Sequence, residues 1–570
     1  MQTTAQFALT LLLFGAASGL PTGFAQGMGQ STAGPTAAVQ PTVEQPLAGQ
    51  IEALLAEPGA ARSHWGIAVT TLQGALIYGH NEGKLFRPAS NNKIFTTATA
   101  MALLGPEKTF TTRVFGEFDA ATGVVTGDLE LVGGGDANFA ADDLPYRASG
   151  SGKRALSPPA LADLASLADQ VAARGVKRIN GDVVGDDTLY PYQPYAESWA
   201  QDDQIWGYGA PVSALTIDNN QLKLIVTPRK RLTAGGGAEA NAASVQLEQN
   251  VPYYTVEAQV YTVAAGAKAE GVQIERLPGS RLVRVFGSMQ AGAPADVEEI
   301  AIADPAYYAA MVFDAMLRQR GVVIAGGAGV RHRFSSDAIP YLDQWLTPDP
   351  CDDRMVAAEP TGAGAAASAD GSASCACGSP AASADYGQML ASRTSAPLVE
   401  DLVLTNKVSQ NLHAELFLHN LGLMAPCGSG SIEDGARLIR ANLLHAGLET
   451  GEFFFFDGSG LSAHDLVTPS ATVRFLSYVA RQPWFAQWKA SLPDAGEDGT
   501  LRERFPDPPV RGHLFAKTGT LGESRALSGF LDTASGRSVI FSIFVDEEAP
   551  AGAEDRATLD KIVTAIAEDE

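Results

Sequence analysis

The stretch RPASNNKIFTTATAMALLGPE, residues 87–107, places a serine and a lysine three positions apart before a run of apolar and small residues. Gly105-Pro106 ends that run, so the stretch predicts a helix whose first turn carries Ser90 and Lys93. Side chains at this spacing share one helix face, and the helix amino end adds partial positive charge and free backbone N–H groups. Lys93 is therefore either solvent-facing beside a capping serine, or the base that activates Ser90.

A second polar motif lies in NKVSQNLHAE, where Ser409-Gln410-Asn411 interrupts a segment with helical periodicity over 396–424. At a helix boundary these residues either cap the helix or direct a hydroxyl and an amide into a cleft. The motif alone does not distinguish the two interpretations.

A third motif, Lys517-Thr518-Gly519 followed by Thr520, lies on a predicted strand in HLFAKTGTLGES. It is either a strand end that enters a turn or a binding edge. A glycine there lets a substrate backbone lie close to the strand, while the lysine and the hydroxyls can bind a carboxylate. The three motifs in this order supply different parts of one acyl-transfer site.

The pattern of apolar and polar residues changes between these motifs. Residues 107–345 show strand alternation and turn signals, interrupted by a predicted helix at 158–175. Residues 346–385 are of low complexity, and we expect them to form a surface insertion that buries too little apolar surface to order itself. Helical periodicity and late strands return over 386–570.

Composition excludes several classes of function. The chain has 40 basic and 64 acidic residues, a formal charge of −24, which argues against a nucleic-acid partner. No histidine shows a triad or metal-ligand spacing, and Gly133-Gly134-Gly135 lacks the Lys-Ser/Thr of a phosphate loop. We therefore expect no metal and no cofactor.

The amino end predicts export. Residues 1–25 contain the apolar core FALTLLLFGAASGL (7–20), too short to span a bilayer, before a small-residue site, and so predict a signal peptide. The alternative is a buried N-terminal helix, since no Lys or Arg precedes the core. Residues 26–46 are polar and rich in Pro and Gly, which predicts a flexible linker. We expect a periplasmic or extracellular cell-wall location without a stable membrane anchor.

The chain has four cysteines, Cys351, Cys375, Cys377 and Cys427. An even number in an exported protein favours disulfides, and the sequence leaves their pairing open. The close spacing of Cys375 and Cys377 would also fit a metal site, but no histidine or second close pair lies nearby.

The SxxK, SxN and KTG motifs resemble those of the active-site serine penicillin-binding proteins and serine β-lactamases. Ser90 and Ser409 are 319 positions apart (409 − 90), an insertion that resembles the class C penicillin-binding proteins, the D-alanyl-D-alanine carboxypeptidase/endopeptidases. The resemblance runs from about residue 47 to the end except for 347–385, and it includes GDLELVGGGDANF (127–139), INGDVVGDDTLY (179–190), YGAPVSALTIDNN (208–220), TNKVSQNLHAE (405–415) and DGSGLS (457–462).

The resemblance implies an α/β (α+β) fold. A serine β-lactamase/transpeptidase-like domain, with helices on both faces of a sheet, would form from residues 47–106 and 386–570. The β-rich region 107–345 would be inserted as one or two extra modules.

It also implies roles for the motif residues. Ser90 would be the acylated nucleophile and Lys93 its base, kept neutral by burial and by the charge of Lys517. Ser409 would relay a proton to the leaving amine, and Asn411 would hold the substrate amide. Lys517, Thr518 and Thr520 would bind the terminal carboxylate, and Gly519 would let the substrate backbone lie close to the strand. The backbone N–H groups of Ser90 and Thr520 would form the oxyanion hole.

Members of the family also recognise the free amino end of a diaminopimelate side chain, using an acidic residue and an aromatic residue five positions later. Asp203 and Tyr208 match that pattern. Two positions depart from the family. Ala463 stands where members carry an arginine after DGSGLS, and Gly522 stands where some have glutamine. These departures bear on the choice of stem peptide.

The expected function is that of a serine D-Ala-D-Ala carboxypeptidase and/or endopeptidase with peptidoglycan stem peptides and β-lactams as partners. The alternatives are a β-lactamase or D-amino-acid peptidase with the same site, or a non-catalytic cell-wall-binding protein. A binding protein has no need of the base.

Overall fold

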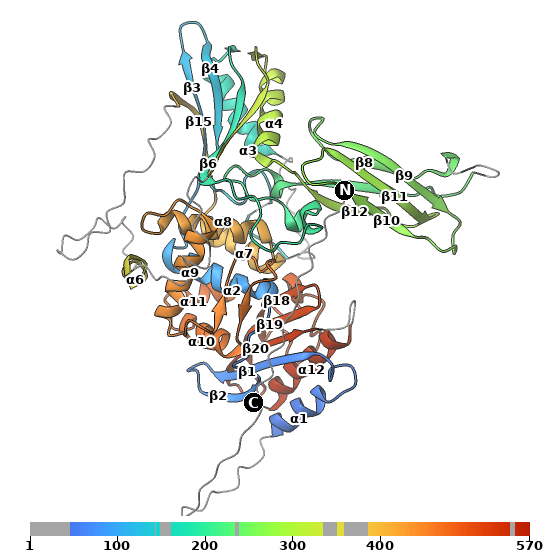
Figure 1. Ribbon diagram of the computed structural model, residues 1–570, viewed down its shortest axis with the longest axis vertical. Coiled ribbons are helices and arrows are strands. Elements are labelled where there is room, and N and C mark those ends of the chain that lie inside the picture. The colour runs from blue at the N-terminus through green and yellow to red at the C-terminus, as the bar shows by residue number, and fades with distance from the viewer. Residues whose placement is uncertain are drawn as a thin grey trace, which may run out of the picture. The chain divides into compact units, whose positions relative to one another are not determined.

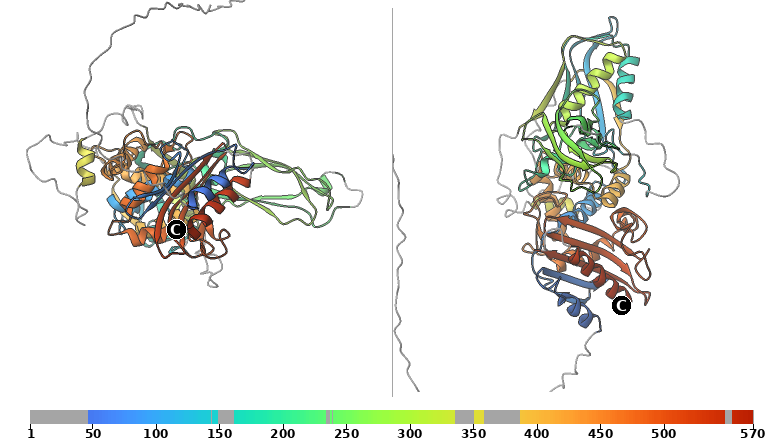
Figure 2. Two further views of the ribbon diagram at one scale, coloured as in Figure 1. Left: turned by 90° about the horizontal axis from the view of Figure 1, so that it is seen from below. Right: turned by 90° about the vertical axis from the view of Figure 1, so that its right-hand side faces the viewer.

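The first sheet joins the two ends of the chain. In the computed structural model, which describes residues 46–142, 144–148, 161–233, 237, 239–334, 350–357, 386–547 and 553–569, five strands pair in the order β18-β19-β20-β1-β2. Figures 1 and 2 show the early strands beside the late ones. All neighbours are antiparallel, and the strands are β1 (His64–Thr71), β2 (Leu76–His80), β18 (Leu514–Leu521), β19 (Ser524–Asp532) and β20 (Ser538–Asp546).

Both faces of this sheet are covered by helices, because alternate residues of its central strands are apolar on each side. In β20, Phe541 and Ile543 belong to the core formed with α1 (Pro46–Leu55) and α12 (Glu554–Asp569). Phe544 of the same strand faces the other core. That second core is formed with α2 (Asn92–Leu103), α7 (Leu398–Val408), α8 (Asn411–Met424), α9 (Ile432–His445), α10 (Pro469–Val479) and α11 (Phe485–Ser491).

A larger sheet of seven strands is formed by the part of the sequence between β2 and β18. Its path is β13-β5-β4-β3-β15, with β6 paired to β4 and β14 paired to β6. The helices α3 (Ala162–Ala173) and α4 (Pro305–Gln319) share its apolar core. The strands are β3 (Thr111–Asp119), β4 (Val124–Val132), β5 (Arg178–Ile179), β6 (Val183–Pro191), β13 (Val323–Ile324), β14 (Ala328–Arg333) and β15 (Gln388–Thr394).

The strand β15 differs from the expected division of the chain. It pairs with β3 in the larger sheet, whereas the predicted boundary at 386 assigns these residues to the transpeptidase-like part. The physical reason is that Met389 to Thr394 find backbone partners on the free edge of β3, and Leu390 and Ala391 join the core of that sheet.

Three smaller sheets complete the described strands. Two have three strands each, in the orders β10-β11-β9 and β12-β7-β8, and the third is the short pair β16-β17 before and after the DGSGLS loop. The strands are β7 (Gln221–Thr227), β8 (Ser244–Leu247), β9 (Thr255–Val263), β10 (Gly271–Glu275), β11 (Leu282–Gln290), β12 (Asp296–Ala301), β16 (Phe453–Phe454) and β17 (Leu466–Val467).

The expectation that 346–385 has no ordered structure is wrong for residues 350–357. They form α6 (Pro350–Ala357), in which Val356 is buried and Asp352 forms an ion pair with Arg437 of α9 at 2.7 Å. Cys351 of this helix and Cys427 are both disulfide-bonded. A covalent link and a buried ion pair order a helix that its composition alone would not.

The signal peptide predicted at 1–25 and residues 26–45 of the linker lie outside the described residues. Among the helices that the structure describes, none combines the length and the apolarity needed to cross a bilayer.

Candidate active site

The structure brings Ser90 and Lys93 together. Ser90 lies in a short 3-10 turn, η1 (Ala89–Asn91), and Lys93 is the second residue of α2, so the serine precedes the α-helix instead of standing in its first turn. The difference arises at Ala89, whose φ of 45° is left-handed and redirects the chain before the helix begins. The Nζ of Lys93 lies 2.8 Å from the Oγ of Ser90.

Lys93 is fully buried, and its ammonium group also donates to Asn411 Oδ1 at 2.6 Å and to the carbonyl of Ser459 at 2.8 Å. Burial lowers the pKa of Lys93 to about 7, although nearby carboxylates oppose the change. The expected effect of burial is present. The charge of Lys517 was expected to lower the pKa of Lys93. The repulsion between the two lysines is instead found to lower the pKa of Lys517, through the charge of Lys93.

Ser409 ends α7 with a left-handed φ of 63°, which breaks the predicted helical segment into α7 and α8. The turn presents the Oγ of Ser409 to the Nζ of Lys517 at 2.9 Å. Lys517 is fully buried on β18 and also donates to the carbonyl of Thr518 at 2.9 Å. Burial, followed by the charge of Lys93, lowers the pKa of Lys517 well below its usual range.

Gly519 brings the β18 edge against the Ser90 turn. A Cβ at this position would lie 2.6 Å from the carbonyl oxygen of Pro88, so only glycine lets the strand approach so closely. Thr520 follows it and is exposed. The Oγ of Thr518 lies 2.7 Å from that of Thr500.

Three buried acids beneath Lys93 were not identified from the sequence: Glu415, Asp457 and Asp465. Glu415 accepts hydrogen bonds from the backbone N–H of Gly458 and of Ser459, and Asp457 accepts from the Gly460 N–H at 2.6 Å. Burial and the charge of Asp457 raise the pKa of Glu415 to about 8. The four phenylalanines before Asp457 were the available signal, since they predict that this loop enters the core.

These features occur in a sequence that matches the D-Ala-D-Ala carboxypeptidase 3 (S13) family over residues 47–339 and 369–566. The chain belongs to this family. It is similar to a D-alanyl-D-alanine carboxypeptidase of Actinomadura sp. (strain R39), with 30% identity over 91% of this chain and 84% of that protein. It is also similar to the D-alanyl-D-alanine carboxypeptidase DacB of Haemophilus influenzae, with 24% identity over 84% of each chain.

The crystal structure of penicillin binding protein 4 (dacB) from Haemophilus influenzae has the same fold. It aligns with a TM-score of 0.70 and 22% identity, covering 90% of this chain and 98% of that one. The expected resemblance and the mixed α/β fold with added β-rich regions are thus confirmed.

In this S13-family protein, Asp203 contacts Tyr208, which in turn contacts Asn411. The Tyr208 hydroxyl donates to Asp203 Oδ1 at 2.9 Å, and the Tyr208 carbonyl accepts from Asn411 Nδ2 at 2.8 Å. Burial raises the pKa of Asp203, while the Tyr208 hydrogen bond opposes this. Ala463 is exposed at the end of the DGSGLS loop, and Gly522 has a φ of +50° with open space around it.

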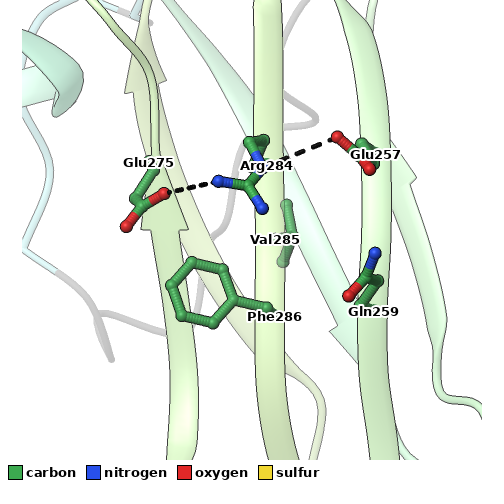
Figure 3. A pocket seen from close by; sticks show the side chains of 6 residues that line it. All are labelled: Glu257, Gln259, Glu275, Arg284, Val285 and Phe286. Carbon is green, nitrogen blue, oxygen red and sulfur yellow. Dashed lines mark hydrogen bonds and ion pairs between the residues drawn. The ribbon is translucent and has the colours of Figure 1, made fainter.

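A pocket elsewhere carries none of this chemistry. It lies on β9, β10 and β11, where the guanidinium of Arg284 pairs with Glu257 at 3.5 Å and with Glu275 at 3.2 Å (Figure 3). Its other lining residues include no serine or lysine. Over the described part of the chain, no cluster of three or more His, Cys, Asp or Glu side chains is arranged to hold a metal ion.

Proposed function

We propose that this enzyme is a serine D-Ala-D-Ala carboxypeptidase of peptidoglycan that acts through an acyl-enzyme on Ser90. The observation that carries the proposal is the 2.8 Å contact between the buried Lys93 amine and the Ser90 hydroxyl. A serine hydroxyl needs an adjacent base to become a nucleophile, and a lysine with a pKa of about 7 is substantially neutral at physiological pH.

In the first half-reaction, the Ser90 Oγ attacks the carbonyl carbon of the penultimate D-alanine while its proton passes to Lys93. The backbone N–H groups of Ser90 and Thr520 stabilise the oxyanion. When the C–N bond breaks, the leaving D-alanine takes a proton from Ser409, and the proton that Lys93 took from Ser90 replaces it by way of Lys517, which leaves Lys93 neutral again. The 2.9 Å contact between Ser409 and Lys517 supports this relay. Water then hydrolyses the Ser90 ester with Lys93 as base.

Substrate binding uses the rest of the motif residues. Lys517, Thr518 and Thr520 bind the terminal carboxylate, and Asn411 binds the peptide amide. D-alanyl cross-links have the same D-configured centre on the acyl side, which supports endopeptidase activity with the same residues. β-Lactams acylate Ser90 because their strained amide mimics the D-alanyl-D-alanine end.

Asp203, Tyr208 and Ala463 set the preference for the stem peptide. The paired Asp203 carboxylate and Tyr208 hydroxyl accept an ammonium group at the end of the side chain of the third residue. Ala463 offers no positive charge to a carboxylate on that side chain. The enzyme therefore tolerates a third residue that ends in an amine alone. Its place of action is the cell wall, reached by export through the N-terminal segment.

Intact mass after incubation with benzylpenicillin tests the proposal, using the wild-type protein and Ser90→Ala. One stable adduct per chain that is absent from the variant is the expected result, followed by release of D-alanine from a pentapeptide by the wild type alone. Rapid turnover of penicillin without a persistent adduct would indicate a β-lactamase. If neither an adduct nor turnover is observed, the remaining interpretation is a non-catalytic wall-binding protein.

A further inference from the structure

A loop that none of the three motifs contains reaches the carboxylate-binding strand. The segment 493–495 runs beside β18, with the Ala495 N–H donating to the Leu514 carbonyl at 3.0 Å and the Ala516 N–H to the Pro493 carbonyl at 3.1 Å. The chain then turns through η6 (Gly499–Leu501). This path places Thr500 beside Thr518.

The loop is also held in place by α7. Lys407, two residues before Ser409, is nearly buried, and its Nζ donates to Asp498 at 2.8 Å and to the Leu492 carbonyl at 2.6 Å. Gly499 has a φ of +56°, and a Cβ there would lie 2.7 Å from the Lys407 carbonyl oxygen. A partly buried ion pair and a close backbone approach therefore fix the position of Thr500 relative to the SxN motif.

The donors around the carboxylate site can be counted. An ammonium group has three N–H donors, and two of those on Lys517 are used by Ser409 and by the Thr518 carbonyl. A carboxylate is an acceptor with about four lone-pair sites, so it needs further donors. In the pair of hydroxyls on Thr500 and Thr518, one proton closes the 2.7 Å hydrogen bond and the other remains to be donated outward.

We propose that Thr500 is a further substrate-binding residue, whose hydroxyl acts with that of Thr518 to bind the terminal carboxylate of the peptide. The inference rests on the proposed function and deepens it. Thr500 is exposed, so its hydroxyl is accessible to a ligand and a change there leaves the core intact.

Two peptides test this proposal, one ending in L-Lys-D-Ala-D-Ala with a free carboxylate and the same peptide with a C-terminal amide. The variants are Thr500→Val, which has nearly the same shape without the hydroxyl, and Thr500→Ser, which keeps the hydroxyl. Thr122→Val is the matched control, because the exposed Thr122 hydroxyl bonds to Asp119 in the β3–β4 turn and not, among the described residues, to any part of the site.

We expect Thr500→Val to raise KM for the acid peptide about tenfold, the loss of one hydrogen bond to a charged group, with kcat within about twofold. KM for the amide should be unchanged, and Thr500→Ser and Thr122→Val should match the wild type. Should Thr500→Val fold poorly, Thr500→Ala carries the same expectation.

An unchanged KM for the acid peptide would overturn the inference. So would an equal loss on both peptides, which indicates a structural role only. A wild-type protein that hydrolyses neither peptide would overturn the proposed function as well, and this would be evident before any variant is compared.

Discussion

Glu415 and Lys93 are joined through one residue, Ser459. The carboxylate of Glu415 accepts the Ser459 N–H at 2.8 Å, and the Ser459 carbonyl accepts a hydrogen bond from the Nζ of Lys93 at 2.8 Å. The base is thus buried in a site where Asp457, Glu415 and Asp465 raise its pKa. Burial favours the neutral amine and the acids favour the ammonium, and burial has the larger effect.

The first prediction concerns the pH dependence of acylation. The pKa of Lys93 is about 7, so the fraction of neutral base rises as the pH rises through 7. We expect the second-order rate constant for acylation by benzylpenicillin to increase about tenfold per pH unit below 7 and to level off above it. Stopped-flow measurement from pH 5 to 9 would show this, and a flat profile would contradict Lys93 as the base.

The second prediction separates the role of Asp457 from that of the base itself. Among the acids that raise the pKa of Lys93, Asp457 has the largest effect, so Asp457→Asn should lower that pKa and move the acid limb of the profile downward by about one pH unit. The amide also leaves a buried backbone N–H without its acceptor, at a cost of about 1–3 kcal/mol in the free energy of unfolding.

The control for this experiment is Glu449→Gln, a change at an exposed acid, which should move neither the limb nor the stability. An acid limb that stays in place in Asp457→Asn would show that this carboxylate does not act on Lys93.

The third prediction concerns the contact between the DGSGLS loop and the Ser90 turn. Gly460 has a φ of +84°, and a Cβ there would lie 1.8 Å from the carbonyl oxygen of Ala89. Gly460→Ala should displace the turn that carries the nucleophile and lower the acylation rate at least about a hundredfold, since small misplacements of reacting groups have effects of this size.

Gly536→Ala provides the comparison, because Gly536 has a similar φ of +81° with no atom near the added Cβ. It should cost only about 1–2 kcal/mol of backbone strain, measured as the free energy of unfolding, and leave acylation unchanged. Equal acylation rates in the two variants would refute the steric argument.

The fourth prediction concerns stability and pH in the inserted region. Burial would lower the pKa of His332, but its contacts with Asp187 at 2.9 Å and Asp304 at 3.6 Å raise the pKa to about 9. Tyr192 covers the ring. The folded pKa exceeds the unfolded value of about 6.5, so the stabilisation is complete below pH 6.5 and is lost as the pH rises through 9.

Denaturant unfolding of the wild type and His332→Gln should therefore differ by up to about 3 kcal/mol at pH 6 and by much less at pH 10. The exposed His64 provides the control variant His64→Gln, which should match the wild type at both pH values. A difference for His332→Gln that is the same at pH 6 and pH 10 would show that the ring acts by packing alone.

The sequence predicted the sheet and much of the site because the relevant signals are local. The mostly apolar runs of β19 and β20 and the Gly105-Pro106 stop of α2 require no knowledge of distant parts of the chain. The motif residues were likewise identifiable, since Ser90 and Lys93 are only three positions apart in the sequence.

Tertiary structure decided what surrounds them. The placement of β15 on β3, the order of α6, and the acids beneath Lys93 depend on segments that are far apart in the chain. The left-handed turn at Ala89 is a further case, because it is held by the approach of Gly460 from a loop 371 positions away (460 − 89). Residue types and their local spacing determine which groups can react. Burial and long-range contacts set their pKa values and distances, because desolvation and charge act through space and not along the sequence.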